Sequence, residues 1–195
     1  MGTASSTQEN SPHWDDLFAI AQSQMGYFTT KQAAAAGYSP QLLHKYLENG
    51  KVSRVRRGIY RLVHFPASEH EDLVMLWLWT EQVGVFSHET ALALHDLSDA
   101  LPSRVHMTVP VIWRRRRLRV PDGLVLHFAD LGDTDRASFS AVPVTTPERT
   151  LRDCIEADVS PDLVRQGVLQ ARQRGLISQR DEAEISSALA RTEST

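Results

Sequence analysis

The sequence has very little cysteine and no long apolar segment, and these absences exclude several classes of protein. Cys154 is the single cysteine among 195 residues, so neither an internal disulfide nor a cysteine-rich zinc site can form. The longest strongly apolar run, 73–79, is far too short to span a bilayer. Residues 1–12, MGTASSTQENSP, lack a basic start and an apolar centre, which excludes a secretory signal and predicts a loose leader. We therefore expect a cytoplasmic protein of bacterial type that does not contact membranes.

The composition is otherwise that of an ordinary globular protein. Hydrophobic residues make up 42% of the chain and charged residues 23%, which is unlike a disordered sequence. A chain of 195 residues can form one large domain or two small ones, each with its own core. The formal net charge of −3 argues against a uniformly basic nucleic-acid coat protein.

Two basic segments nevertheless stand in this acidic chain. Residues 25–66 hold seven Lys/Arg and one acid, Glu48, and residues 104–119 hold six arginines and no acid. Between them, residues 67–103 hold seven acids and no Lys or Arg. Because salt screens charges over roughly 8 Å under physiological conditions, a local basic face can bind a polyanion whatever the overall sign.

The first basic segment follows a pattern of three helices. Residues 13–25 place apolar side chains at helical spacing, namely Trp14, Leu17, Phe18 and Ala21. A second, alanine-rich helix begins at Thr29, which forms a capping-box pattern with Gln32, with Phe28 as a hydrophobic staple and Gly37 as the terminator.

The third helix has Ser39 as N-cap and Pro40 at its first position, and Asn49-Gly50 ends it. Its apolar face is formed by Leu42, Leu43, Tyr46 and Leu47, and its polar face by Gln41, His44, Lys45 and Glu48. A short glycine-containing turn between two such helices indicates a helix-turn-helix, whose second helix enters the major groove. Gln41 suits adenine there, and Lys45 suits guanine or a phosphate.

A basic hairpin follows directly. The segment GKVSRVRRGIYRL, 50–62, predicts a strand over 51–56, a turn at Arg57-Gly58 and a return strand over 59–62. Alternation predicts Val55 facing inward and paired, with Val52, against Tyr60 and Leu62, while Arg54, Arg56 and Arg61 face outward. Three helices and a basic hairpin predict a winged helix-turn-helix whose guanidinium groups hold phosphates.

Each feature also has an ordinary structural explanation. An amphipathic helix always has a polar face, and many charged hairpins are solvated edge strands that use Arg and Lys against aggregation. The order of the elements, their caps and the charge bias together favour DNA binding.

Residues 67–190 predict a mixed α+β domain with a small sheet. Helices are expected over 68–83, over 87–99 with Ser87 as N-cap, and in two segments separated near Gly175. Strands are expected over 102–110 and, as a strand, a turn and a second strand, over 111–128. Residues 139–157 predict a short strand and then a helix capped by Thr146, with Pro147 at N1 and Leu151, Cys154 and Ile155 facing inward.

The run Arg114 to Arg117 has no acid nearer in sequence than Asp122. It is therefore either a solvated loop tip or a second contact with a nucleic-acid backbone.

The residues with chemical potential do not form a recognisable catalytic or metal site. His70, His88, His95, His106 and His127 lack the i, i+4 spacing of a helical zinc pair. Neighbours on a helix do not face one another, which argues against a triad of Ser87, His88 and Glu89. Asp130, Asp133 and Asp135 do not have the spacing of an EF-hand. His106 and His127 are expected to hydrogen-bond across a sheet; we predict no catalytic residues, no metal and no cofactor.

Four segments resemble the AbiEi family of antitoxins, the DNA-binding half of type IV toxin–antitoxin pairs in bacteria. They are GYFTTKQAAAAGYS…LLHKYLENGKVSRVRRGIYRL, FSHETALALHDLSD, VHMTVP and VPVTTPERTLRDCI, and they lie within residues 25–180. The resemblance implies a winged helix-turn-helix over 13–66 that represses its own operon at inverted repeats, and an antitoxin domain over 67–190 followed by a tail, 191–195. It also implies a role in phage defence and a nucleotidyltransferase-like toxin, which the antitoxin counters without a stable complex.

The predicted contacts to the double-stranded operator are Thr30, Lys31, Ser39, Gln41, His44, Lys45, Lys51, Arg54, Arg56, Arg57 and Arg61, with Arg114, Arg115, Arg116 and Arg117 as a second basic contact. Some longer relatives carry a nuclease-like domain, for which this sequence leaves no room, so we expect no enzymatic activity. Two alternatives stay open: a winged helix that binds a protein through the acidic stretch 69–99, and a plain transcriptional regulator without a toxin partner.

Overall fold

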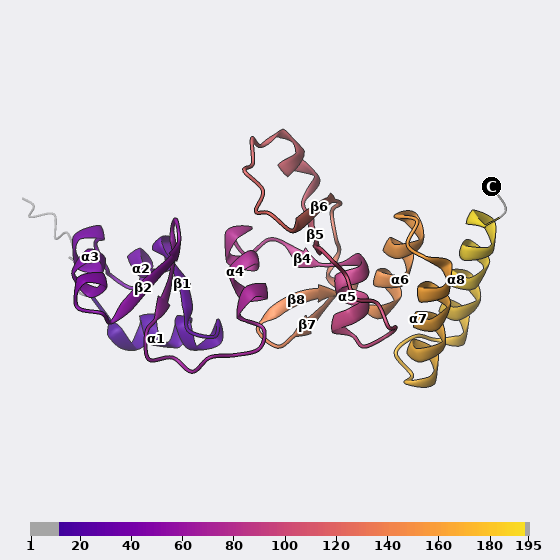
Figure 1. Cartoon of the computed structure of the whole chain (residues 1–195), viewed down its shortest axis with the longest axis horizontal. Helices are drawn as coiled ribbons and strands as arrows, with labels where there is room; N and C mark the ends of the chain where they lie inside the picture. The colour runs from indigo at the N-terminus through magenta and orange to yellow at the C-terminus, as the bar shows by residue number, and fades with distance from the viewer. Residues whose placement is uncertain (1–11, 194–195) are drawn as a thin grey trace, which may run out of the picture. The chain divides into compact units, whose positions relative to one another are not determined.

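A computed structural model describes residues 12–193, and the chain divides after Trp79 into two compact units (Figure 1). Each unit is described by itself. The expected leader, 1–12, lies outside the described residues except for Pro12. The expected tail begins inside a helix, since α8 spans Gln179–Thr192.

The first unit has the element order of a winged helix-turn-helix. Its antiparallel sheet has the order β1-β3-β2. Strand β1 was not predicted, because three residues carry no periodicity and only their pairing with β3 makes them a strand. The elements are α1 (Trp14–Ser23), β1 (Tyr27–Thr29), α2 (Thr30–Ala35), α3 (Pro40–Glu48), β2 (Val52–Arg56), β3 (Ile59–Leu62) and α4 (Glu71–Trp79).

The caps read from the sequence are present. The Thr29 side chain accepts a hydrogen bond from the Gln32 backbone N–H, and the Gln32 side chain accepts one from the Thr29 N–H, which completes the capping box. Ser39 accepts from the Leu42 N–H at the start of α3. On α1, Leu17 is fully buried as expected, whereas Trp14 is 40% exposed and only partly covered.

Helix α4 belongs to the first unit, which therefore extends beyond the boundary expected at residue 66. It packs against β1 and β3. Its first residue, Glu71, lies 2.7 Å from Nη2 of Arg61 on β3 and accepts a hydrogen bond of 2.9 Å from the Tyr27 hydroxyl. These polar contacts fix the start of α4 to the sheet.

The second unit is a five-stranded mixed sheet with helices. The strand order is β6-β5-β4-β8-β7, with β5 parallel to β6 and β4 parallel to β8. Its elements are β4 (Val85–Phe86), α5 (His88–Leu94), β5 (Val105–Val109), the 3-10 helix η1 (Val111–Arg115), β6 (Leu124–Phe128), the 3-10 turn η2 (Asp133–Asp135), β7 (Arg136–Phe139), β8 (Val142–Thr145), α6 (Pro147–Glu156), α7 (Pro161–Gln173) and α8.

The core of this unit confirms part of the sequence analysis. Leu151, Cys154 and Ile155 on α6 are buried together with residues of α5, α7 and α8. Burial raises the pKa of the Cys154 thiol, as expected for a core cysteine. None of the helices within residues 12–193 is long and apolar enough to cross a membrane.

One local prediction in the second unit is wrong, and a second is only partly confirmed. The strand expected after Pro110 is the 3-10 helix η1, because the Trp113 and Arg116 backbone N–H groups fold back onto the carbonyls of Pro110 and Trp113. Ser87 is the N-cap residue of α5, as predicted, but its hydroxyl makes no cap hydrogen bond and instead accepts one from Thr108.

Candidate nucleic-acid interface

Helix α3 presents a polar face to solvent, as predicted for a recognition helix. Gln41, His44, Lys45 and Glu48 are all exposed, whereas Leu43 on the other side is only 3% exposed. Their spacing of three and four residues places the four polar side chains on one side of the helix. The Ser39 hydroxyl forms the N-cap hydrogen bond of α3. In recognition helices this N-terminal end contacts the bases.

The tip of the wing is attached to the start of α2. The Thr30 backbone N–H donates a 2.9 Å hydrogen bond to the Gly58 carbonyl, and the Thr30 hydroxyl lies 3.4 Å from the same oxygen. Gly58 has a φ of 79°, a left-handed conformation that glycine adopts without steric cost. Lys31 and Arg57, which follow Thr30 and precede Gly58, are both exposed.

A β-bulge changes how the wing presents its arginines. Arg54 pairs with Tyr60 and Arg56 with Ile59, so Val55 is an extra residue in β2. Val55 is 38% exposed, and the prediction that it faces inward is wrong. Because paired residues point to the same face, Arg54 lies on the face of Tyr60 and Arg56 on the opposite face, that of Ile59.

The face of Tyr60 is the one that packs on the helices α1 to α3. Tyr60 stacks on Phe28 with ring centroids 5.7 Å apart, and both contact the core of these helices. The face of Ile59 and Arg61 is the one that meets α4. The wing therefore carries cations on both faces of its ribbon. The sequence predicted them on one outward face.

Arg54, Arg56 and Arg57 are exposed and have no ion pair with any carboxylate of residues 12–193. An unpaired surface guanidinium keeps its full hydrogen-bonding capacity for a phosphate. The wing thus has three cations that are available to bind phosphates.

Arg61 and Lys51 lie elsewhere. The prediction that Arg61 is outside the ribbon is wrong: its side chain is 16% exposed, and it bonds Glu71 and the carbonyls of Phe65 and Pro66. The Lys51 ammonium lies 4.9 Å from the centroid of the Tyr46 ring, which is on the apolar side of α3. Neither cation shares the polar face of α3.

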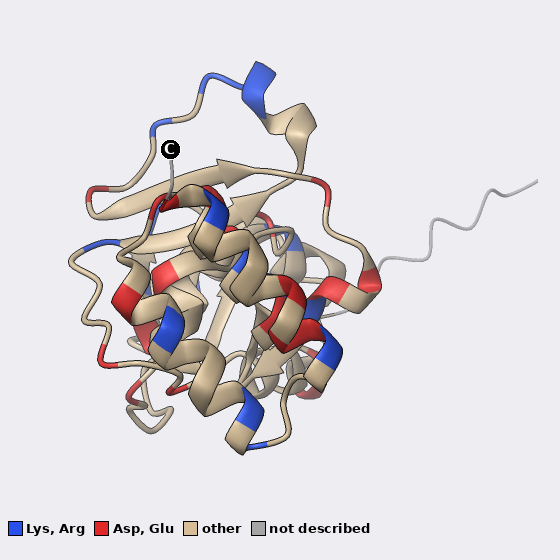
Figure 2. Ribbon diagram, turned by 90° about the vertical axis from the view of Figure 1, so that its right-hand side faces the viewer, with Lys and Arg blue, Asp and Glu red and all other residues tan. Residues whose placement is uncertain are grey.

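The second basic segment lies in the second unit, on η1 and the loop between η1 and β6. This loop extends away from the sheet, with its Lys and Arg residues blue at the top of Figure 2. Arg116 lies over the Trp113 ring at 4.0 Å and pairs with Glu81 at 2.9 Å. Local sequence patterns do not connect Arg116 with Glu81, which is 35 residues away. Arg115 and Arg117 are exposed, with no ion pair to residues 12–193.

The histidines of the second unit contact one another and do not form a recognisable metal site among residues 12–193. His106 Nδ1 lies 3.0 Å from His127 Nε2, which confirms the expected contact across the sheet. Ser87 Oγ lies 2.9 Å from His88 Nδ1, so the prediction that these two side chains do not face one another is wrong. The prediction assumed that both residues lie within a helix, whereas α5 begins at His88. Within residues 12–193, no group of three His, Cys, Asp or Glu side chains is placed to hold a metal.

The element order, the caps and the basic ribbon define the first unit as a winged helix-turn-helix, a domain class used by many transcriptional regulators. Residues 15–63 match the family model described as "Transcriptional regulator, AbiEi antitoxin", which confirms the resemblance over that segment. The family is one of regulators rather than of enzymes. No curated protein sequence matches the chain.

The fold is also similar to the crystal structure of the RV2827C protein from Mycobacterium tuberculosis. The two are 15% identical in sequence, the similarity covers 90% of this chain and 75% of that one, and the TM-score is 0.43.

Proposed function

We propose that this chain is the DNA-binding antitoxin of a type IV toxin–antitoxin pair, which represses its own operon at inverted repeats. It counters a nucleotidyltransferase-like toxin without forming a stable complex. One observation carries the DNA-binding part: an exposed polar helix face and three unpaired arginines belong to a single winged helix-turn-helix, and the family model matches that segment.

In this proposal Gln41, His44 and Lys45 contact bases in the major groove, and the wing contacts phosphates. Cations on both faces of a ribbon suit a wing that enters a groove tip first, between two phosphate backbones. Thr30 and Lys31 border the wing tip and add backbone contacts. Arg115 and Arg117, on the second unit, form the second basic contact.

The test is binding of the full chain to the DNA that precedes its own reading frame, measured by fluorescence anisotropy over a range of salt concentrations. We expect tight binding to that DNA, weaker binding to scrambled DNA of the same length, and a steep salt dependence. Absence of binding, together with no retention on heparin, would favour the alternative of a protein-interaction module.

The antitoxin part is tested separately in cells. We expect the full chain to restore growth when the nucleotidyltransferase-like gene beside it is expressed, while the two proteins do not co-purify. No such neighbouring gene, or no rescue, would leave a plain transcriptional regulator.

Replacement of Gln41 by alanine should remove sequence discrimination more than affinity. A bidentate pair between glutamine and adenine contributes about 1–3 kcal/mol of discrimination, so binding to the operator should weaken by roughly tenfold or more. Binding to scrambled DNA should change little, because Gln41 carries no charge. Parallel titrations of the two DNAs measure the ratio, and an equal loss on both would remove Gln41 from the base-reading set.

Glu48 is the one acid on the polar face of α3, and its removal should strengthen DNA binding. The carboxylate lies 3.4 Å from His44 Nε2 and is exposed, so it repels a nearby phosphate backbone. Exposed charge pairs contribute about 0.2–1 kcal/mol, so Glu48→Gln should tighten binding about 1.4- to fivefold. Asp16→Asn, an exposed acid on α1, is the matched control and should leave the affinity unchanged.

A further inference from the structure

The second unit contains a polar cavity that none of the roles above uses. Its volume is about 420 Å³, and its walls come from α5, β5, β6, η1 and α6. Pockets that bind small molecules typically measure about 300–1,000 Å³. The cavity is thus large enough for a ligand of moderate size.

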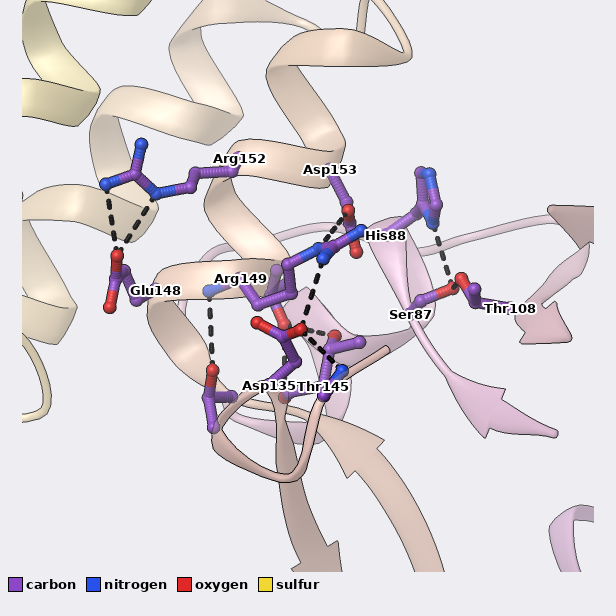
Figure 3. Close-up of polar contacts among 12 residues, drawn as sticks. Ser87, His88, Thr108, Asp135, Thr145, Glu148, Arg149, Arg152 and Asp153 are labelled. Carbon is purple, nitrogen blue, oxygen red and sulfur yellow. Dashed lines mark hydrogen bonds and ion pairs between the residues drawn. The ribbon is translucent and has the colours of Figure 1, made fainter. Parts of the chain in front are cut away.

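A buried chain of hydrogen bonds ends at this cavity. Thr108 Oγ1 donates to Ser87 Oγ over 2.8 Å, and Ser87 Oγ lies 2.9 Å from His88 Nδ1 (Figure 3). Ser87 accepts from Thr108, so its own proton is free to be donated to His88 Nδ1; in that tautomer the imidazole proton is on Nε2. His88 is only 7% exposed, yet its Nε2 has no hydrogen-bond partner among residues 12–193.

A second buried side chain at the cavity also has an unused polar atom. Asp153 is 3% exposed, and its Oδ1 accepts a 2.7 Å hydrogen bond from Arg149 Nε. Its Oδ2 is buried without a partner. Because buried polar atoms are nearly always hydrogen-bonded, the unpaired Asp153 Oδ2 is an exception that an occupant of the cavity would account for.

Two arginines line the cavity, together with the carboxylates of Asp153 and Glu156. Arg149 lies between the carboxylates of Asp153 and Asp135, which fix its orientation, and its Nη2 has no hydrogen-bond partner within the described residues (Figure 3). Arg114 lies 5.5 Å from the centroid of the Phe128 ring at the cavity wall. A pair of guanidinium groups is suited to the oxygens of a phosphate.

The histidines of the cavity are neutral. Burial, and then the charges of His127 and His106, lower the pKa of His88 to about 3, and burial lowers the pKa of His127 to about 4. At pH 7 they hydrogen-bond without adding charge, so the charged side chains that line the cavity are Arg114, Arg149, Asp153 and Glu156. A ligand that matches this lining carries an anionic group for the arginines and His88, and hydroxyl or amino donors for the two carboxylates.

We propose that this cavity binds a nucleoside monophosphate, with its phosphate between Arg114, Arg149 and His88 Nε2 and its hydroxyl or amino groups at Asp153. The Phe128 ring provides an apolar wall for a planar base. This site is independent of the winged helix and its role on DNA.

The test is isothermal titration calorimetry of the full chain with AMP, GMP, CMP and UMP, with adenosine and inorganic phosphate as partial ligands. We expect at least one monophosphate to bind, and adenosine and phosphate to bind at least tenfold more weakly. Arg114→Ala should weaken nucleotide binding at least tenfold. Arg119→Ala changes an exposed arginine of the loop that follows η1, which does not line the cavity, and should stay within twofold.

Several results would overturn the proposal. They are no binding of any monophosphate at millimolar concentration, equal binding of adenosine or inorganic phosphate, or equal effects of the two arginine substitutions. The double variant Arg54→Gln and Arg56→Gln should bind nucleotide normally; a loss there would place the nucleotide on the wing and not in the cavity. Failure of DNA binding alone leaves this prediction unaffected.

Discussion

A variant with both Arg54 and Arg56 replaced by glutamine should bind the operator about 100-fold more weakly than the native chain, if each lost phosphate contact costs roughly tenfold in affinity. Both guanidinium groups are exposed and unpaired, so their loss should leave the fold intact. The slope of log K against log salt should become shallower by about 0.9 for each lost contact. Anisotropy titrations at four or more salt concentrations measure both quantities.

The matched control is Arg104→Gln, an exposed arginine of the second unit that has no ion pair with residues 12–193. It changes the net charge by the same amount as each single wing substitution, so it corrects for long-range electrostatics. An unchanged slope in the double variant would remove the wing from the DNA contact.

The two single variants distinguish how the wing meets DNA. Because the bulge at Val55 turns Arg54 and Arg56 to opposite faces, a wing that enters a groove tip first uses both arginines. Arg54→Gln and Arg56→Gln should then each weaken binding about tenfold. If the ribbon instead lies flat on one backbone, only one of the two substitutions will have an effect.

Local signals predicted most of the winged helix. The capping box at Thr29 and the cap at Ser39 involve residues three apart, so the sequence contains both partners of each hydrogen bond. The alternation of polar and apolar residues on α3 likewise depends on helix geometry alone. These features, and the family resemblance, are confirmed.

The errors arise where a partner is distant in sequence or where a strand departs from regular pairing. The alternation of residues along β3 predicts that Arg61 faces solvent. It cannot predict the ion pair with Glu71, because Glu71 lies on the next helix, α4. Val55 looked inward because an unbroken period of two was assumed, and a bulge removes that period. In the second unit, the ion pair of Arg116 with Glu81 could not be predicted, because the two residues are distant in sequence.

The cavity shows the same limit on functional prediction. His88, Asp153 and Arg149 come from two helices that are more than 50 residues apart in sequence, and no spacing rule connects them. The histidines do not have the spacing of a metal site in the sequence. Their proposed role depends on which side chains are buried and which polar atoms lack a partner, and both properties are known only from the folded structure.

Replacement of Glu71 by glutamine should destabilise the first unit by about 2 kcal/mol at pH 7, since the half-buried network loses one of its two acceptor oxygens and Arg61 loses its counter-charge. Glu71 accepts hydrogen bonds from Arg61, Tyr27 and the Ser68 backbone N–H. For a domain of this size, the loss corresponds to a fall in Tm of about 10 °C. Glu69→Gln, an exposed acid of the preceding loop, should change the free energy of unfolding by less than about 0.5 kcal/mol.

The pH dependence follows from the pKa of Glu71. Burial alone would raise this pKa, but the hydrogen bonds from Arg61, Ser68 and Tyr27 outweigh burial and lower it. A carboxyl whose pKa is lower in the folded state stabilises fully above its unfolded pKa of about 4.3, and this contribution is lost as pH falls through the folded value. The stability difference between native chain and Glu71→Gln should therefore shrink below about pH 4, as urea titrations at several pH values will show.

The same variant decides the role of Arg61. Its guanidinium lies on the face of the ribbon that meets α4, away from α3, so Glu71→Gln should bind the operator normally at a temperature where it remains folded. The circular dichroism of the sample establishes that temperature, and anisotropy under the same conditions measures the affinity. A loss of DNA affinity in the folded variant would instead show that Arg61 contacts DNA, as the alternation of the sequence alone predicts. The wing tip would then contribute a smaller share of the binding energy.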